Sequence, residues 1–60
     1  MNKKTEAFLE AVKQNNVFLV KRLLSDPDVD PAAENNYAIC RAAKKGHTEI
    51  VKLLLADPRV

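Results

Sequence analysis

The residue types that most often carry catalysis and metal binding are thinly represented in this chain of 60 residues. His47 is the only histidine and Cys40 the only cysteine, so neither can pair with a second ligand of its kind at a zinc site. No residue beside Cys40 in the sequence is suited to activate it as a nucleophile. We therefore interpret Cys40 as a small buried apolar residue and His47 as a structural residue at the start of a helix.

Three carboxylates alternate along residues 26–30, in a pattern that superficially resembles a calcium-binding loop. Such a loop needs a glycine at its sharp turn and a closing glutamate, whereas here Pro27 and Pro31 interrupt the run. Asp26, Asp28 and Asp30 are better explained as turn formers. Since Gly46 is the only glycine, the chain also has no glycine-rich phosphate loop. The sequence thus predicts no catalytic residue, no metal site and no cofactor, and hence a protein that is not an enzyme.

The overall composition is that of a small globular domain, with 47% apolar and 30% charged residues. The net charge of +2 is spread over the chain, without the concentrated basic patch and stacking aromatics expected of a nucleic-acid-binding protein. Charged residues break up every apolar stretch, so we expect no secretory signal and no membrane partner. A lone cysteine fits a reducing compartment, and we expect an intracellular, cytoplasmic protein.

A pattern recurs along the chain at a spacing of 31 residues, with ten identities among the 29 pairs that this offset allows. Ordinary composition would give roughly one or two by chance. The most extended match aligns residues 23–29 with residues 54–60. Repetition at such a period is typical of stacked supersecondary units.

Apolar residues at helical spacing predict four short helices. Their expected ranges are 5–14, 17–25, 36–45 and, from His47 or Thr48, up to residue 56. Asn15 and Gly46 mark helix ends, because both tolerate a left-handed backbone, and Asn16 is suited to cap the next helix. Residues 26–36 should form a turn-rich, hairpin-like loop anchored by an inward-pointing Val29.

Small side chains on the first helix of each unit are expected to let neighbouring units lie close together. These residues are Ala7, Ala11, Ala38, Ala42 and Ala43. Phe18 falls off the apolar stripe of its helix, and two alternatives stay open for it. We favour packing over the N-terminal flank against Met1, and the alternative is an exposed binding anchor.

Residues 37–55 resemble an ankyrin repeat. The most specific part is Ala42-Ala43 followed by Gly46-His47 and then by residues 50–55. Residues 8–12 and 20–24 resemble an N-terminal capping repeat of the same family. Two departures stand out: Cys40 replaces the histidine of the family's Thr-Pro-Leu-His opening, and the unit is shorter than the family's usual length of about 33 residues.

The resemblance implies an all-α, ankyrin-type solenoid fragment of two helix-turn-helix repeats, the first covering about residues 1–29. The second covers about residues 30–60 and runs into the start of a third, as in the N-terminal piece of a longer array. The resemblance also implies a non-catalytic scaffold that binds another protein on the concave surface of that array. The partner-binding residues carried over from the family are Lys13, Gln14, Ala33, Glu34, Asn36, Lys44 and Lys45.

Two further expectations concern partners. An isolated pair of repeats should self-associate through its uncapped C-terminal face, around Ile50, Leu53 and Leu54. The alternative function is a small helix-turn-helix protein that binds nucleic acid through its fourth helix. That helix would expose Thr48, Glu49 and Lys52, and Glu49 would repel phosphate.

Overall fold

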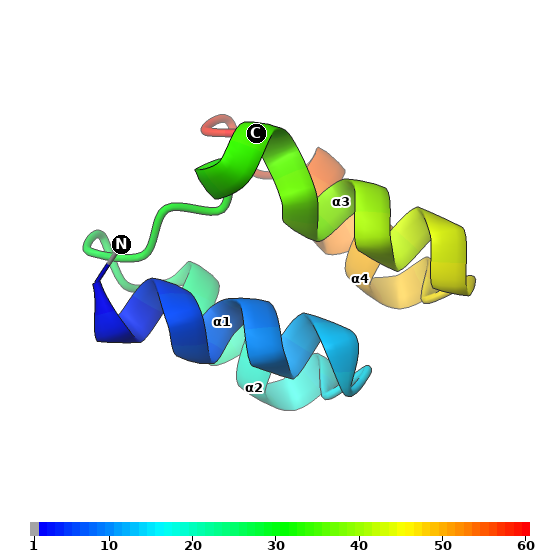
Figure 1. The fold of residues 1–60 in the computed structure, drawn as a ribbon, viewed down its shortest axis with the longest axis horizontal. Helices are drawn as coiled ribbons and strands as arrows, with labels where there is room; N and C mark the ends of the chain where they lie inside the picture. The colour runs from blue at the N-terminus through cyan, green and yellow to red at the C-terminus, as the bar shows by residue number, and fades with distance from the viewer. Residues whose placement is uncertain (1) are drawn as a thin grey trace.

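The computed structural model describes residues 2–60 and shows four α-helices with no strand in that range (Figure 1). The helices are α1 (Lys3–Lys13), α2 (Val17–Leu24), α3 (Ala33–Lys45) and α4 (Thr48–Leu55). The all-α prediction is therefore confirmed. Three of the helices match the expected ranges to within about two residues at each end, which is the usual uncertainty of such boundaries.

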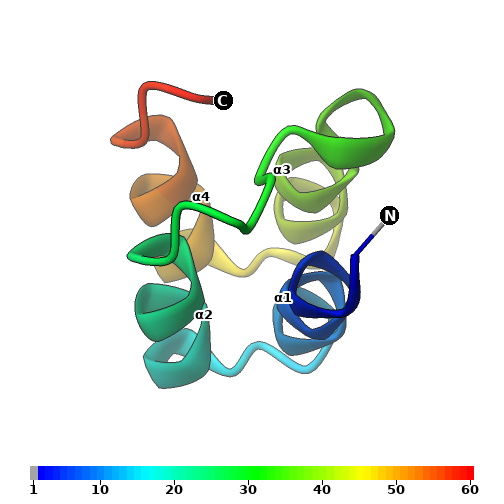
Figure 2. The same cartoon turned by 90° about the vertical axis from the view of Figure 1, so that its left-hand side faces the viewer.

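The four helices form two layers of two. Viewed nearly along the helices, α1 and α3 lie side by side in one layer, and α2 and α4 form the other (Figure 2). Each of α1 and α3 also packs against the helix that follows it in sequence. The molecule is thus two antiparallel helix pairs stacked together, with the connection between the pairs along one edge.

Asparagine and glycine set the ends of the helices, as the sequence predicts. The Asn16 side-chain oxygen accepts a hydrogen bond of 3.2 Å from the backbone N–H of Leu19, which caps the start of α2. Asn2 caps α1 in the same way, with a bond of 2.7 Å from the N–H of Thr5. Asn15 and Gly46, which the 31-residue offset aligns, both have the predicted left-handed backbone, with φ of 56° and 74°.

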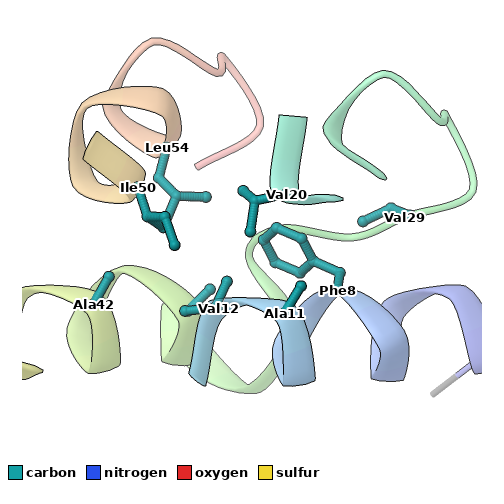
Figure 3. Packing of buried hydrophobic residues seen from close by; sticks show 9 residues of the cluster. Phe8, Ala11, Val12, Val20, Val29, Ala42, Ile50 and Leu54 are labelled. Atoms are coloured by element: carbon teal, nitrogen blue, oxygen red, sulfur yellow. The ribbon is translucent and has the colours of Figure 1, made fainter. Parts of the chain in front are cut away.

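The core lies between the two layers, where side chains from all four helices converge (Figure 3). Phe8 is its largest member and is fully buried. The other buried apolar residues are Ala11, Val12, Val20, Val29, Ala38, Ala42, Ile50 and Leu54. Val29 is the predicted loop anchor, and its burial fixes the connection between the helix pairs against the core.

The connection is built from two consecutive turns rather than a β-hairpin. The Asp26 carboxylate accepts a hydrogen bond of 2.9 Å from the N–H of Asp28, and Asp30 accepts one of 3.0 Å from Ala32. Hydrogen bonds donated by a backbone N–H to the carboxylate two residues earlier are typical of aspartate turns. The turn-rich part of the prediction is correct, and no strand pair is present in the described loop.

The start of α3 departs from the expected boundary at Asn36. Backbone hydrogen bonding begins the helix at Ala33, but Glu34, Asn35 and Asn36 have left-handed φ angles of 58°, 57° and 64°. Regular right-handed helix begins only at Tyr37. Asparagine tolerates this region, whereas for glutamate the Cβ crowds the following carbonyl. A left-handed turn of three residues has no hydrophobic period, which is why the sequence pattern did not reveal it.

We predict that Glu34→Gly will raise stability. The left-handed backbone costs a residue with a Cβ about 1–2 kcal/mol, and glycine removes that cost. Against this, glycine has more conformational freedom to lose on folding, which lowers stability by about 0.5–1 kcal/mol. The expected gain in the free energy of unfolding is up to about 1.5 kcal/mol, measured by urea titration. Glu49→Gly is the matched control, because Glu49 lies in the ordinary helix α4 and its replacement should destabilise. Equal losses in the two variants would contradict this account of Glu34.

Several expected surface assignments are wrong. Phe18 is 70% exposed, so its favoured packing over the N-terminal flank is not seen within residues 2–60; Met1 lies outside the described residues. The guanidinium of Arg22 lies 5.8 Å from the centre of the Phe18 ring. Ala7 and Ala43 are exposed, because each faces away from the neighbouring helix pair, whereas Ala11, Ala38 and Ala42 are buried as expected.

The expected self-association surface around Ile50, Leu53 and Leu54 is also wrong. Ile50 and Leu54 are fully buried in the core between the helix layers, and Leu53 is half-buried.

Candidate functional site

The seven predicted partner-binding residues fall into two groups at opposite ends of the α1–α3 layer. Ala33, Glu34 and Asn36 lie at the start of α3, beside the loop. The second group, at the ends of α1 and α3, consists of Lys13, Gln14, Lys44 and Lys45. Because the helices run side by side (Figure 1), the groups are separated by on the order of 15 Å, the rise of ten helical residues. The structure thus places the two groups at opposite ends of the layer and does not merge them.

An open cavity of about 400 Å³ lies at the loop end of this layer. It is lined by Asn2, Thr5, Asp30, Ala33 and Glu34. Of these, Ala33 and Glu34 were predicted as partner-binding residues, and the other three were missed. The sequence does contain a feature that could have identified Thr5, since it is a polar residue at the N-terminal end of an apolar helical stripe. The cavity joins the start of α1 to the start of α3 and thus spans both helix pairs.

Hydrogen bonds hold the wall of the cavity in place. The N–H of Asp30 donates to the Thr5 hydroxyl over 3.1 Å, and Thr5 is only 1% exposed. The Asn2 side-chain amide donates to the carbonyl of Asp28 over 2.8 Å. These two bonds tie the beginning of α1 to the loop. Asn36 is the counterpart of Thr5 in the second helix pair, and its buried Oδ1 accepts no hydrogen bond from any described residue.

The charged residues that line the cavity are acidic, and the charged residues of the far group are basic; Lys3 and Lys4 also lie at the loop end, where Lys4 is paired with Asp26 at 3.1 Å. Asp30 and Glu34 line the cavity at the loop end, and both are exposed to solvent. Lys13, Lys44 and Lys45 lie at the far end and are also exposed. A ligand lying along α1 and α3 would therefore meet negative charge at one end and positive charge at the other.

The side chain of Arg59, in the turn that follows α4, connects the second helix pair to the first. The Arg59 guanidinium donates hydrogen bonds of 2.7 Å to the carbonyl of Leu24 and of 2.7 Å to the carbonyl of Val29. It also forms a two-point contact with the Asp57 carboxylate, at 3.0 and 2.7 Å. Arg59 thereby satisfies a carbonyl at the end of α2 and another in the loop. We call this arrangement the arginine clamp.

A model of the family described as ankyrin repeats (3 copies) matches residues 2–60. The chain belongs to the ankyrin-repeat family. Searches of curated proteins and of solved structures gave no significant match. The two helix pairs, α1–α2 and α3–α4, are accordingly two ankyrin repeats, and the family generally serves as a protein-interaction scaffold and is typically non-catalytic.

The residues singled out for chemistry occupy structural or surface positions of these ankyrin repeats. His47 precedes α4, as predicted, and its Nε2 atom is buried without a partner among residues 2–60. Cys40 is a free, exposed thiol, so its predicted burial is wrong; it lies on a face of α3 that no described element covers. Within residues 2–60, no group of three or more His, Cys, Asp and Glu side chains is arranged to hold a metal ion. None of the helices that the structure describes is long and apolar enough to cross a membrane.

Asp26 and Asp57, which the 31-residue offset aligns, have lowered pKa values. Hydrogen bonds from the Arg59 side chain, and then from its backbone N–H, hold the pKa of Asp57 below its ordinary value. For Asp26, the N–H of Asp28 is the main cause of the lowered pKa, and the Lys4 ammonium at 3.1 Å adds to it. Because the folded-state pKa of each group is depressed, its stabilising contribution is present above the ordinary pKa and is lost as the pH falls through the folded value.

We predict that Arg59→Ala will destabilise the chain by about 1–2 kcal/mol at neutral pH, since it removes charged hydrogen bonds to two carbonyls and a carboxylate at a partly exposed site. Part of the difference from the native chain should vanish below the lowered pKa of Asp57, where that carboxylate is protonated in both proteins. Urea unfolding at neutral and strongly acidic pH measures both effects. Arg22→Ala is the control, because the Arg22 guanidinium lies over the exposed Phe18 ring and forms no hydrogen bond or ion pair within residues 2–60, so its loss should cost less than about 1 kcal/mol. Equal losses at the two positions would refute the clamp.

Proposed function

We propose that this chain is a non-catalytic protein-interaction scaffold whose partner binds the concave surface formed by the loop and by helices α1 and α3. The observation that supports this most directly is the open cavity of about 400 Å³ at the loop end of that surface. The proposed partner-binding residues are Lys13, Gln14, Ala33, Glu34, Asn36, Lys44 and Lys45. Asn2, Thr5 and Asp30 join them as lining residues of the cavity.

The charges along the surface support a particular kind of partner segment. Asp30 and Glu34 favour a lysine or arginine side chain in the cavity, and the lysines at the far end favour an acidic side chain on the same segment. Because these charges are exposed, they should contribute more to specificity and association rate than to affinity. The rigid wall made by Thr5 and Asp30 reduces the ordering cost of binding.

We further infer that the scaffold acts without cofactor, metal, nucleic acid or membrane partner, and that it acts inside the cell, where the free thiol of Cys40 would stay reduced. We do not propose the alternative function, a helix-turn-helix protein that binds nucleic acid. It requires a different fold, in which α4 would serve as the recognition helix. In this ankyrin pair, Ile50 and Leu54 of α4 are fully buried. On the exposed side, the Glu49 carboxylate lies 4.0 Å from the Lys52 ammonium.

A library of random peptides selected against the immobilised chain tests the proposal. We expect the selected peptides to be enriched in lysine or arginine and to bind about two- to fivefold more weakly to the Glu34→Lys variant, the loss that an exposed ion pair implies. Glu49→Lys makes the same charge change on the outer face of α4 and should leave affinity unchanged. Peptides that are insensitive to Glu34→Lys, or equally sensitive to Glu49→Lys, would exclude the concave surface as the binding site.

A further inference from the structure

Three exposed side chains lie together on the outer face of α2. Phe18, Lys21 and Arg22 are three and four residues apart, so they are neighbours on one side of the helix. Phe18 lies about 200° around the helix from Val20, which is fully buried in the core. The three residues therefore lie on the side of the α2–α4 layer that is opposite the concave surface (Figure 2). We call them the aromatic-basic face.

The second repeat carries a different set of side chains at the same positions. The counterparts of the aromatic-basic face, in chain order, are Glu49, Lys52 and Leu53. On α4 the Glu49 carboxylate lies 4.0 Å from the Lys52 ammonium, so this lysine has an acidic neighbour on its own helix. On α2 a phenylalanine takes the place of that glutamate, and α2 contains no acidic residue.

The two cations of the aromatic-basic face are not neutralised within the described part of the chain, since neither Lys21 nor Arg22 forms an ion pair there. The acidic residues that follow α2 are held by Lys4 instead, which lies 3.1 Å from Asp26 and 3.3 Å from Asp28. The Arg22 guanidinium lies over the Phe18 ring, 5.8 Å from its centre. A guanidinium over a ring keeps the N–H groups at its edge, which fit a carboxylate in a two-point contact.

We propose that the aromatic-basic face is a second docking site, which binds a short acidic segment of a partner protein. The segment places an apolar side chain on the Phe18 ring and two carboxylates against Lys21 and Arg22. Covering a ring that is 70% exposed supplies most of the affinity. The exposed cations contribute chiefly orientation and association rate.

The extent of the aromatic-basic face favours a short peptide over a nucleic acid or a membrane. Its two cations lie within a single turn of α2. The neighbouring helix α4 exposes Glu49, which would repel a phosphate chain or an anionic bilayer that extended across both helices. A segment of a few residues needs to contact α2 alone.

Titration with a short peptide, followed by nuclear magnetic resonance of the backbone amides, tests the proposal. The probe is a capped pentapeptide with a central leucine between two pairs of glutamates, and its control has serine in place of the leucine. We expect the leucine peptide to shift the amides of residues 17–25 and to bind more tightly than the serine peptide. The lysines at the ends of α1 and α3 also attract carboxylates, but no large apolar side chain is exposed beside them in the described structure. Shifts confined to those lysines, or equal binding of the two peptides, would overturn the proposal.

Substitutions on α2 and α4 show which side chains bind the leucine peptide. We expect Phe18→Ala to weaken binding about five- to tenfold, because it removes the apolar contact. Lys21→Ala should weaken it about two- to fivefold, the loss that an exposed ion pair implies. Lys52→Ala is the matched control and should leave binding unchanged. All three residues are exposed, so the variants should fold. Unchanged binding by Phe18→Ala, or equal losses at Lys21 and Lys52, would contradict the assignment.

Two further measurements separate this site from other binding modes. Anionic lipid vesicles and a single-stranded oligonucleotide, added at the same total charge as the peptide, should perturb residues 17–25 less than the peptide does. An equal or larger effect of either would overturn the assignment to an acidic protein segment. Glu34→Lys on the concave surface should leave the binding of the leucine peptide unchanged, so the outcome is independent of the function proposed for that surface.

Discussion

Replacing Phe8 by alanine is expected to unfold the chain at room temperature. Phe8 is the largest buried side chain and lies beside Val20 and Val29 in the cluster that all four helices share (Figure 3). Removing a buried phenylalanine costs about 3–5 kcal/mol, because it loses the transfer energy of the ring and leaves a cavity. A chain of 60 residues has a total stability of only about 3–9 kcal/mol. The loss is thus comparable to the whole stability, and circular dichroism should show little remaining helix.

Phe18→Ala is the matched control for this prediction. It makes the same substitution at a ring that is 70% exposed and touches the Arg22 guanidinium. Its expected cost is below about 1 kcal/mol, so helix content and melting should be close to those of the native chain. If the two variants melt alike, the core assigned to Phe8 is wrong.

Enlarging Ala38 to leucine is expected to destabilise the chain by about 1–3 kcal/mol or more. Ala38 is fully buried on α3, which packs beside α1, and three extra carbon atoms have no space there. The helices must move apart, which also loosens the contacts of Ala11 and Ala42 in the same cluster. Urea unfolding measures the loss directly.

Ala7→Leu distinguishes close packing from a general effect of the larger residue. Ala7 is the counterpart of Ala38 but is exposed, because no repeat lies on that side of α1 in the described structure. Leucine is nearly as good a helix former as alanine, so the substitution should change stability by less than about 0.5 kcal/mol. A similar loss at both positions would show that the alanines are not needed for close contact.

Local signals in the sequence account for most of the fold. Each helix follows an apolar stripe, and the ends are marked by residues whose backbone or side-chain chemistry fits a cap, as at Asn16 and Gly46. The internal repeat predicted that the two helix pairs would be alike. These features are predictable because each depends on residues only a few positions apart.

Features that depend on distant residues were not predictable. The exposure of Phe18 depends on which surfaces the helices leave open, and Arg59 reaches a carbonyl 35 positions earlier in the chain. For the candidate site, family resemblance placed Ala33 and Glu34 beside the cavity. It missed Asn2 and Asp30, because their position there follows from the path of the loop rather than from a motif.

The arginine clamp also has a kinetic consequence. Its hydrogen bonds join residues 30 and 35 positions apart, so they can form only after both helix pairs are in place. Contacts that are absent from the transition state leave the folding rate nearly unchanged and slow the reverse reaction. The clamp should therefore act mainly on the lifetime of the native state: in stopped-flow experiments, Arg59→Ala should accelerate unfolding, and a slower folding rate instead would place the clamp in the folding nucleus.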